Sequence, residues 1–120
     1  RDSGCTAISM EDIDKYGIDK VAELALDIAW KGCKAVYVSL DIDVLEAAFC
    51  SGTGTPDFGG MLPRELLRLL KLVTAPGICG MDVVEVSPPF DVSEITSLAA
   101  SRCIINVLCN LALNKSLYKH

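Results

Sequence analysis

The stretch that decides the fold runs from Ala35 to Gly60 and reads AVYVSLDIDVLEAAFCSGTGTPDFGG. Its opening residues, 35–40, are apolar and partly β-branched, which predicts a strand. Asp41 and Asp43 follow, and in an extended chain residues two apart point to the same side, about 6.6 Å apart along the strand. Open α/β proteins bind ligands at the carboxyl ends of their strands. The pair therefore predicts a site for a divalent metal, whose charge would relieve the repulsion between the two carboxylates.

A loop rich in glycine follows the two aspartates. Four glycines between positions 52 and 60 let the backbone take positive φ angles and approach a ligand closely. The loop is not a phosphate-binding P-loop, because no Gly-Lys-Ser/Thr sequence follows it. By itself, an Asp-x-Asp pattern leaves a second interpretation open, namely two solvated carboxylates at the end of a strand.

Helices and strands are predicted to alternate along the chain. This alternation favours a parallel sheet in which the two strands are neighbours joined by the helix between them. Parallel sheets need both faces covered, so two strands indicate part of a larger doubly wound sheet. The predicted elements are a short helix capped by Ser9, a helix over residues 19–31 that stops at Gly32, a strand over 35–40, a helix over 63–73 that begins with Pro63, a strand over 78–86 and an apolar helix from about Ser93.

Composition narrows the range of partners. The 120 residues carry a net charge of −5, which argues against nucleic acid or an anionic membrane as the main partner and favours a cationic ligand. No uninterrupted apolar run approaches the roughly 18 residues of a membrane span, so no transmembrane helix is expected. The six cysteines include no C-x-x-C pair, which favours reduced thiols in a cytoplasmic protein. The single histidine, His120, offers no catalytic site.

Two motifs resemble the ureohydrolase family, the arginases and agmatinases. SLDIDVLEAAFCSGTGTPDFGG, residues 39–60, is similar to the family signature S-x-D-[IV]-D-x-x-D-P followed by P-G-T-G-T-P-x-x-G-G. GMDVVEVSPPFDVSEITSLAA, from Gly80 to Ala100, resembles the family's closing motif and is closest to the agmatinase branch. The resemblance implies an α/β fold, a three-layer α-β-α arrangement with a parallel arginase-like sheet that is incomplete in this chain. Residues 1–120 are then the C-terminal part of a single ureohydrolase domain.

The resemblance also implies an activity, the metal-dependent hydrolysis of a small guanidino compound such as agmatine, with release of urea. Family members hold a binuclear metal site, usually of Mn²⁺ with Ni²⁺ as an alternative, and a metal-bound hydroxide is the nucleophile. Asp41 and Asp43 match metal ligands of the family. Glu85 matches the glutamate that binds the guanidinium, a partner that suits a carboxylate at a strand end. Thr55 matches a threonine that orients Glu85 or the substrate, whereas Asp82 is expected to be structural.

The chain departs from the family pattern in the loop and in its ligand set. Glu46 and Ala47 replace an Asp-Pro pair, and Ser51 replaces the loop proline, which is expected to change the rigidity of the loop more than its chemistry. The histidine and further aspartate ligands that the family carries upstream have no counterpart in these residues. The resemblance further implies a homo-oligomer, a trimer or hexamer, for the full-length protein.

Two other functions compete with an active ureohydrolase. The missing ligands favour a catalytically incompetent fragment or interaction module of the same fold. A phosphotransferase with Asp41 as nucleophile and Asp43 as acid would need a hydroxyl residue two positions after Asp43. Leu45 stands there, which disfavours this alternative. Sequence that encodes the missing histidine ligands upstream of this stretch would favour the enzyme.

Overall fold

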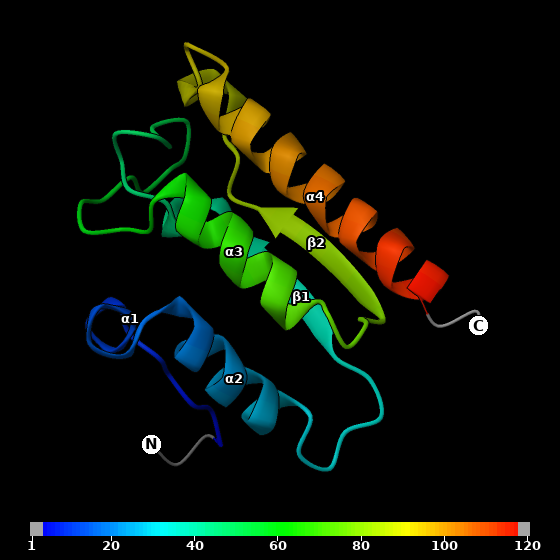
Figure 1. The fold of residues 1–120 in the computed structure, drawn as a ribbon. Helices are drawn as coiled ribbons and strands as arrows, with labels where there is room; N and C mark the ends of the chain where they lie inside the picture. Colours follow the sequence, from blue (N-terminus) through cyan, green and yellow to red (C-terminus); the bar gives the residue numbers. More distant parts are fainter. Residues whose placement is uncertain (1–3, 118–120) are drawn as a thin grey trace.

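A computed structural model describes residues 4–117 of the chain (Figure 1). The elements are α1 (Met10–Tyr16), α2 (Ile18–Ala29), β1 (Tyr37–Asp41), the 3₁₀ turn η1 (Ile42–Val44), α3 (Pro63–Val73), β2 (Gly80–Val84), the 3₁₀ turn η2 (Pro88–Phe90) and α4 (Ile95–Leu117). Each predicted helix and strand is present, and the ends of the strands and of the later helices lie within about two residues of the predicted ones, the usual uncertainty of such boundaries.

β1 and β2 form a two-stranded parallel sheet, and α3 connects them. The register pairs Tyr37 with Gly80 at one end and Asp41 with Val84 at the other, so both strands end at the same edge of the sheet. This arrangement confirms the prediction of parallel neighbours joined by the helix over residues 63–73.

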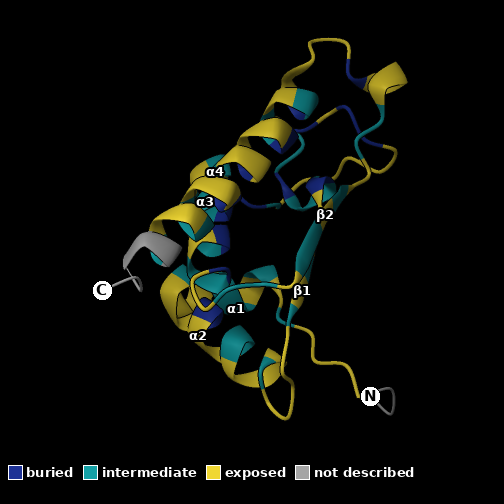
Figure 2. Cartoon of the chain, turned by 90° about the vertical axis from the view of Figure 1, so that its right-hand side faces the viewer, coloured by how far each residue is buried: buried dark blue, intermediate teal, exposed yellow. Residues whose placement is uncertain are grey.

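The helices lie together on one side of the sheet (Figure 2). Val38 of β1 and Met81 of β2 face them, whereas the opposite face is open and leaves Tyr37 55% exposed. The described residues thus supply the sheet and one helical layer of the three-layer fold, and they leave the second face of a parallel sheet uncovered. The buried core comprises Leu40, Ile42, Leu45, Cys50, Met61, Leu66, Leu70, Ala100, Cys103 and Val107.

Asp82 ties the two strands together on the open face. Its carboxylate accepts hydrogen bonds from the Tyr37 hydroxyl at 3.0 Å and from the Ser39 hydroxyl at 2.6 Å. Ser39 and Asp82 are also register partners, so these bonds run directly across the strands. This geometry agrees with the structural role expected for Asp82.

Local sequence signals set the starts of the helices. The Ser9 side chain accepts the backbone N–H of Asp12 at 3.2 Å, and the Asp12 carboxylate accepts the backbone N–H of Ser9 at 2.8 Å, a capping box that fixes the start of α1. α3 begins at Pro63, whose missing N–H costs nothing in the first turn. The Glu65 carboxylate accepts the backbone N–H of Leu62 at 2.8 Å and completes that helix start.

α4 bears on the expectation that no helix crosses a membrane. Its stretch Ile95–Asn114 has a mean hydropathy of 1.4 and is long and apolar enough to cross a membrane, judged by length and composition alone. Polar residues interrupt every apolar run, yet the average over the helix stays apolar. Ala100, Cys103 and Val107 bury one side of α4 in the core, while Leu108 on the other side is 60% exposed. Core helices of soluble proteins pass the same two criteria, so the finding is weak evidence for a membrane.

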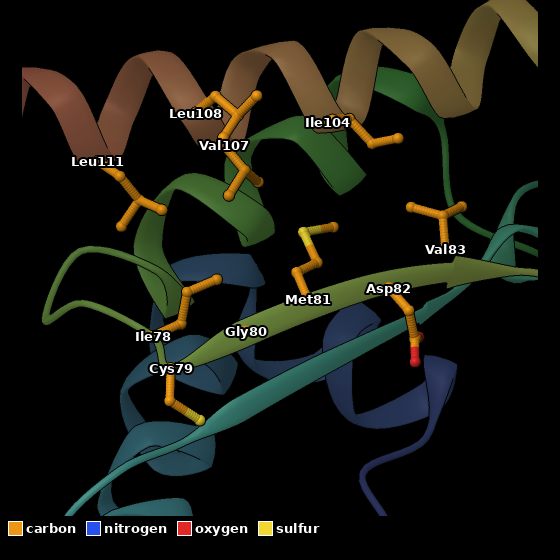
Figure 3. Close-up of a pocket in the computed structure, with 10 residues that line it drawn as sticks. All are labelled: Ile78, Cys79, Gly80, Met81, Asp82, Val83, Ile104, Val107, Leu108 and Leu111. Carbon is orange, nitrogen blue, oxygen red and sulfur yellow. The ribbon is translucent and has the colours of Figure 1, made fainter.

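A pocket of about 310 Å³ lies between β2 and α4, and we refer to it as the β2–α4 groove (Figure 3). Met81 and Val83 point from the strand toward the helix, from which Ile104 and Val107 approach. Asp82 points to the other side of the strand, away from α4. The strand and the helix therefore do not close fully against each other, and their apolar side chains line accessible space.

Candidate functional site

Asp41 and Asp43 occupy the edge of the sheet where both strands end. Asp41 is the last residue of β1, and Asp43 lies in the 3₁₀ turn that follows. The backbone N–H of Asp43 donates to Oδ1 of Asp41 at 3.2 Å, so the first side chain caps the turn that carries the second. The expectation of an extended chain at this point was therefore wrong. A tight turn, rather than the alternation of a strand, brings the two aspartates together.

The pKa of Asp41 reflects its burial and the acids beside it. Desolvation raises the pKa of Asp41 above its ordinary value, and the negative charges of Asp43 and Glu85 add to the increase. The hydrogen bond from the backbone N–H of Asp43 opposes them. Two ion pairs are present among residues 4–117, Lys20 with Glu23 and Arg68 with Asp19, and both lie elsewhere. Three acids thus share one sheet edge without a cationic side chain paired to them in the described part of the chain.

Thr55 belongs to the glycine-rich loop and reaches back to this edge. Its hydroxyl donates to Oδ2 of Asp43 at 2.8 Å. The sequence suggested that Thr55 orients Glu85 or the substrate, whereas the structure gives its hydroxyl to Asp43. Thr55 therefore connects the loop to the candidate metal ligand, and Asp43 has one carboxylate oxygen held by protein.

Glu85 follows β2 directly and stands beside the aspartates. Because Asp41 pairs with Val84 in the register, Glu85 is the next residue beyond the paired strands. Its side chain is exposed, and its backbone has a φ of +67°. A left-handed conformation costs a non-glycine residue roughly 1–2 kcal/mol. Strain of this kind concentrates at functional positions, which favours a functional role for Glu85.

Glu46 is a site-loop residue whose role sequence reasoning missed. Its carboxylate oxygen Oε2 accepts the backbone N–H groups of Gly59 at 2.7 Å and Gly60 at 3.1 Å. The Glu46 N–H donates to the carbonyl of Met61 at 3.0 Å, so both ends of the loop meet. A Cβ atom on Gly60 would stand 2.5 Å from the backbone nitrogen of Glu46, which explains why glycine occupies that position. An acid followed at a fixed distance by Gly-Gly was the available signal, and Glu46 closes the loop.

The residues predicted from the sequence therefore lie around one place. The structure brings together Asp41, Asp43, Thr55 and Glu85, and it places Asp82 on the open face of the strands, bonded to β1. Among residues 4–117, no group of three or more His, Cys, Asp or Glu side chains has the geometry to hold a metal ion. The described residues therefore hold no complete metal site, and Asp41 and Asp43 stay candidate ligands.

Known proteins match both the sequence and the fold. A model of the arginase family matches residues 1–109. A guanidinopropionase from Pseudomonas aeruginosa is 39% identical over 112 residues, which cover 93% of this chain and 35% of that protein. An agmatinase from Escherichia coli is 38% identical over 115 residues, covering 96% of this chain and 37% of that protein. The crystal structure of a hypothetical agmatinase from Burkholderia thailandensis matches with a TM-score of 0.84 and 32% identity, covering 97% of this chain and 37% of that one.

The fold and the motifs around the sheet edge define a part of an arginase-like α/β protein. The chain belongs to the arginase family. It spans about a third of the length of the curated relatives it matches, 35% of one and 37% of the other. The resemblance read from the two motifs and the arginase-like fold that it implied are both confirmed.

Proposed function

We propose that this chain supplies the guanidinium-binding part, and some of the metal ligands, of a ureohydrolase that acts on a small guanidino compound. The observation that carries the proposal is the meeting of Asp41, Asp43 and Glu85 at one sheet edge with no paired cation among the described residues. Divalent metals and a cationic guanidinium would supply the positive charge that such a cluster needs. The names of the relatives, an agmatinase and a guanidinopropionase, support the same class of substrate.

Asp41 and Asp43 would hold the metal. Each has one carboxylate oxygen engaged by the chain, Oδ1 of Asp41 by a backbone N–H and Oδ2 of Asp43 by Thr55, so each keeps its other oxygen available. Hard oxygen donors suit Mn²⁺, and we propose a binuclear Mn²⁺ site with Ni²⁺ as the alternative. Bound metals of this kind lower the pKa of water and stabilise the charge that develops in the transition state. Two aspartates cannot fix two ions, so further ligands must come from the rest of the fold.

Glu85 and Thr55 would orient the reacting groups. The Glu85 carboxylate can accept hydrogen bonds from the N–H groups of a planar guanidinium, and its position beyond β2 places it beside the aspartates. Thr55 fixes the Asp43 carboxylate and therefore the direction in which its free oxygen points. Holding the substrate and the metal ligands in a set geometry lowers the barrier by removing the need to bring them together.

The setting of the activity is part of the same proposal. We place this chain at the C-terminal end of a single ureohydrolase domain, in a cytoplasmic homo-oligomer, a trimer or hexamer. The coverage of about a third of the relatives' length supports a larger domain. In that domain, further elements would cover the open face of the sheet and the β2–α4 groove.

A second candidate is a catalytically incompetent fragment that serves as an interaction module. The exposed apolar side of α4 and the accessible β2–α4 groove favour this candidate, because such surfaces often mark contacts with other proteins. The two candidates differ in a simple way. The module would bind a partner without binding metal, whereas the ureohydrolase requires Asp41 and Asp43 to bind it.

The test compares two polypeptides, this 120-residue chain and a longer one that joins it to the remaining two thirds of the family fold. Urea release from agmatine and guanidinopropionate is measured together with bound Mn²⁺. The short chain should bind Mn²⁺ weakly and release no urea, and the long one should do both. Asp43→Ala in the long polypeptide should abolish turnover through loss of metal.

Asp57→Ala is the matched control, because Asp57 lies in the same loop. In the described residues its carboxylate accepts one hydrogen bond, from the backbone N–H of its neighbour Phe58 at 2.8 Å. This variant should retain both metal and activity. Robust urea release by the short chain would overturn the division of the site. A long polypeptide that stays active with both Asp41 and Asp43 replaced by alanine would overturn the proposed function.

A further inference from the structure

A buried polar network joins the two chain segments that carry the candidate site. It starts at Asp91, which is 6% exposed. Oδ1 of Asp91 accepts the backbone N–H of Thr96 at 3.0 Å, and Oδ2 accepts the backbone N–H and the hydroxyl of Ser97 at 2.8 Å and 2.6 Å. Asp91 thereby fixes the first turn of α4 and, with it, the side chain of Thr96, which is fully buried.

Thr96 passes this constraint to the glycine-rich loop. Its hydroxyl oxygen accepts the backbone N–H of Gly52 at 2.9 Å, in a buried position. The carbonyl of Gly52 accepts the backbone N–H of Ser87 at 2.8 Å. Both polar groups of the Gly52 backbone are therefore used, one toward α4 and one toward the segment that follows β2.

The fit around Gly52 allows no side chain. A Cβ atom there would lie 2.4 Å from Cβ of Asp91, far inside the normal contact distance. Glycine at this position thus reflects a close approach between the loop backbone and Asp91. The approach holds the loop in one place because two hydrogen bonds and a tight contact fix the same residue.

Thr55 and Glu85 lie on the two segments that these contacts join, one near Gly52 and the other near Ser87. Thr55 follows Gly52 by three residues and holds Asp43 through its hydroxyl. Glu85 precedes Ser87 by two residues. The contacts from Asp91 through Thr96 and Gly52 to Ser87 therefore span the distance between the metal-ligand side and the guanidinium side.

We propose that Asp91 and Thr96 are positioning residues that set the separation between Glu85 and the Asp41–Asp43 pair. The inference rests on the proposed function and adds to it two residues that touch neither substrate nor metal. Displacing a guanidinium by about 1 Å from its attack geometry can lower the rate roughly 100-fold. Loss of this network should therefore lower turnover and substrate affinity more than it lowers metal content.

The experiment uses three variants of the long polypeptide described above. Thr96→Ala removes the hydroxyl that accepts the Gly52 N–H, Thr96→Ser retains it, and Ser101→Ala removes another α4 hydroxyl, which bonds the carbonyl of Ser97 and not Asp91. Thr96→Ala should keep its Mn²⁺, raise KM and lower kcat, with kcat/KM reduced roughly 10- to 100-fold. Thr96→Ser should recover most of the activity, and Ser101→Ala should match the wild type.

A second measurement does not depend on catalysis. Hydrogen–deuterium exchange in Thr96→Ala should accelerate together in the peptides around Gly52 and around Ser87, and Thr96→Ser should restore protection in both. Faster exchange confined to α4 would overturn the inference, as would a kcat/KM loss that Thr96→Ser fails to recover. A wild-type polypeptide without urea release would refute the proposed function, while the exchange data would still decide whether Thr96 fixes the two segments.

Discussion

At the edge where the strands end, hydrogen bonds join separate chain segments, whereas the β2–α4 groove is lined by apolar side chains that do not close against one another. At the edge, Glu46 closes the loop, Thr55 holds Asp43, and Gly52 joins the two site segments. In the groove, apolar side chains from β2 and α4 face accessible space instead. Hydrogen bonds between residues far apart in the chain thus hold the candidate site in place, whereas the described residues leave the apolar groove partly open.

After the complete loss of turnover expected for Asp43→Ala, the largest effect is expected at Glu85, on the site side of this comparison. Glu85→Gly should lower kcat/KM of the long polypeptide about 10- to 100-fold, because hydrogen bonds to charged groups contribute about 1.5–3 kcal/mol. Bound metal should stay unchanged. Glu85→Ala loses the same carboxylate but keeps the Cβ atom that disfavours the left-handed backbone.

The glycine variant should therefore be about 1 kcal/mol more stable than the alanine variant, measured by chemical denaturation, because only the glycine relieves the positive φ. Equal stability of the two variants would show that Glu85 carries no backbone strain. Unchanged kinetics in both would remove Glu85 from substrate binding.

The next effect tests how firmly the loop is closed. Gly60→Ala should destabilise the chain by about 1–3 kcal/mol, because the new methyl group would collide with the backbone of Leu45 and Glu46. Gly54→Ala is the matched control, since nothing lies within 4 Å of the Cβ position there. Denaturant midpoints of the two variants measure the difference. Equal midpoints would mean that the loop base yields easily and does not hold the site.

The resemblance and the order of the elements could be predicted from the sequence, and the reasons are local. Pro63 marks the start of α3, and the apolar spacing that follows gives its extent. β1 is a short, mostly apolar run that ends in Asp41, and β2 is followed directly by Glu85. Such signals depend only on residues that are close together in the chain, so they can be recognised in a single sequence.

The geometry at Asp41 and Thr55 could not be predicted in the same way. A strand would continue through Asp43, but the Asp41 side chain bonds the backbone two residues on and starts a turn. The bond from Thr55 to Asp43 depends on how a loop closed by Glu46 and Gly60 folds back, which no local pattern encodes. Asp91 and Thr96 lie further from Gly52 in the chain than Thr55 does from Asp43, so their contacts with Gly52 could not be predicted from the sequence either.

A third prediction addresses the groove side of the comparison and the two faces of α4. Val107 is 2% exposed and Leu108 is 60% exposed. Val107→Ala should destabilise the chain by about 1–3 kcal/mol, because it removes two buried methyl groups and leaves a cavity. Leu108→Ala should change stability by less than about 0.5 kcal/mol in the 120-residue chain. A substantial loss for Leu108 in the long polypeptide alone would show that the remaining fold covers this face of α4.

The smallest expected effect concerns Asp91 and acid. The Ser97 hydroxyl, together with the backbone N–H groups of Ser97 and Thr96, lowers the pKa of Asp91 below its ordinary value of 3.8. A carboxylate with a lowered folded pKa stabilises the fold above the unfolded value, and this contribution disappears as the pH falls below 3.8 and through the folded value.

Asp91→Asn removes the charge at every pH. The wild type should therefore be more stable than this variant at pH 6, and the difference should shrink as the pH falls below 3.8. Melting temperatures of both proteins between pH 6 and pH 3 measure the effect. Asp12 provides the control for an acid far from the site in the chain. Hydrogen bonds from the backbone and side chain of Ser9, at the start of α1, also lower the pKa of Asp12. A wild-type advantage that stays constant down to pH 3 would mean that the ionised form of Asp91 does not hold α4, and the network from Asp91 to Gly52 would then rest on Thr96 alone.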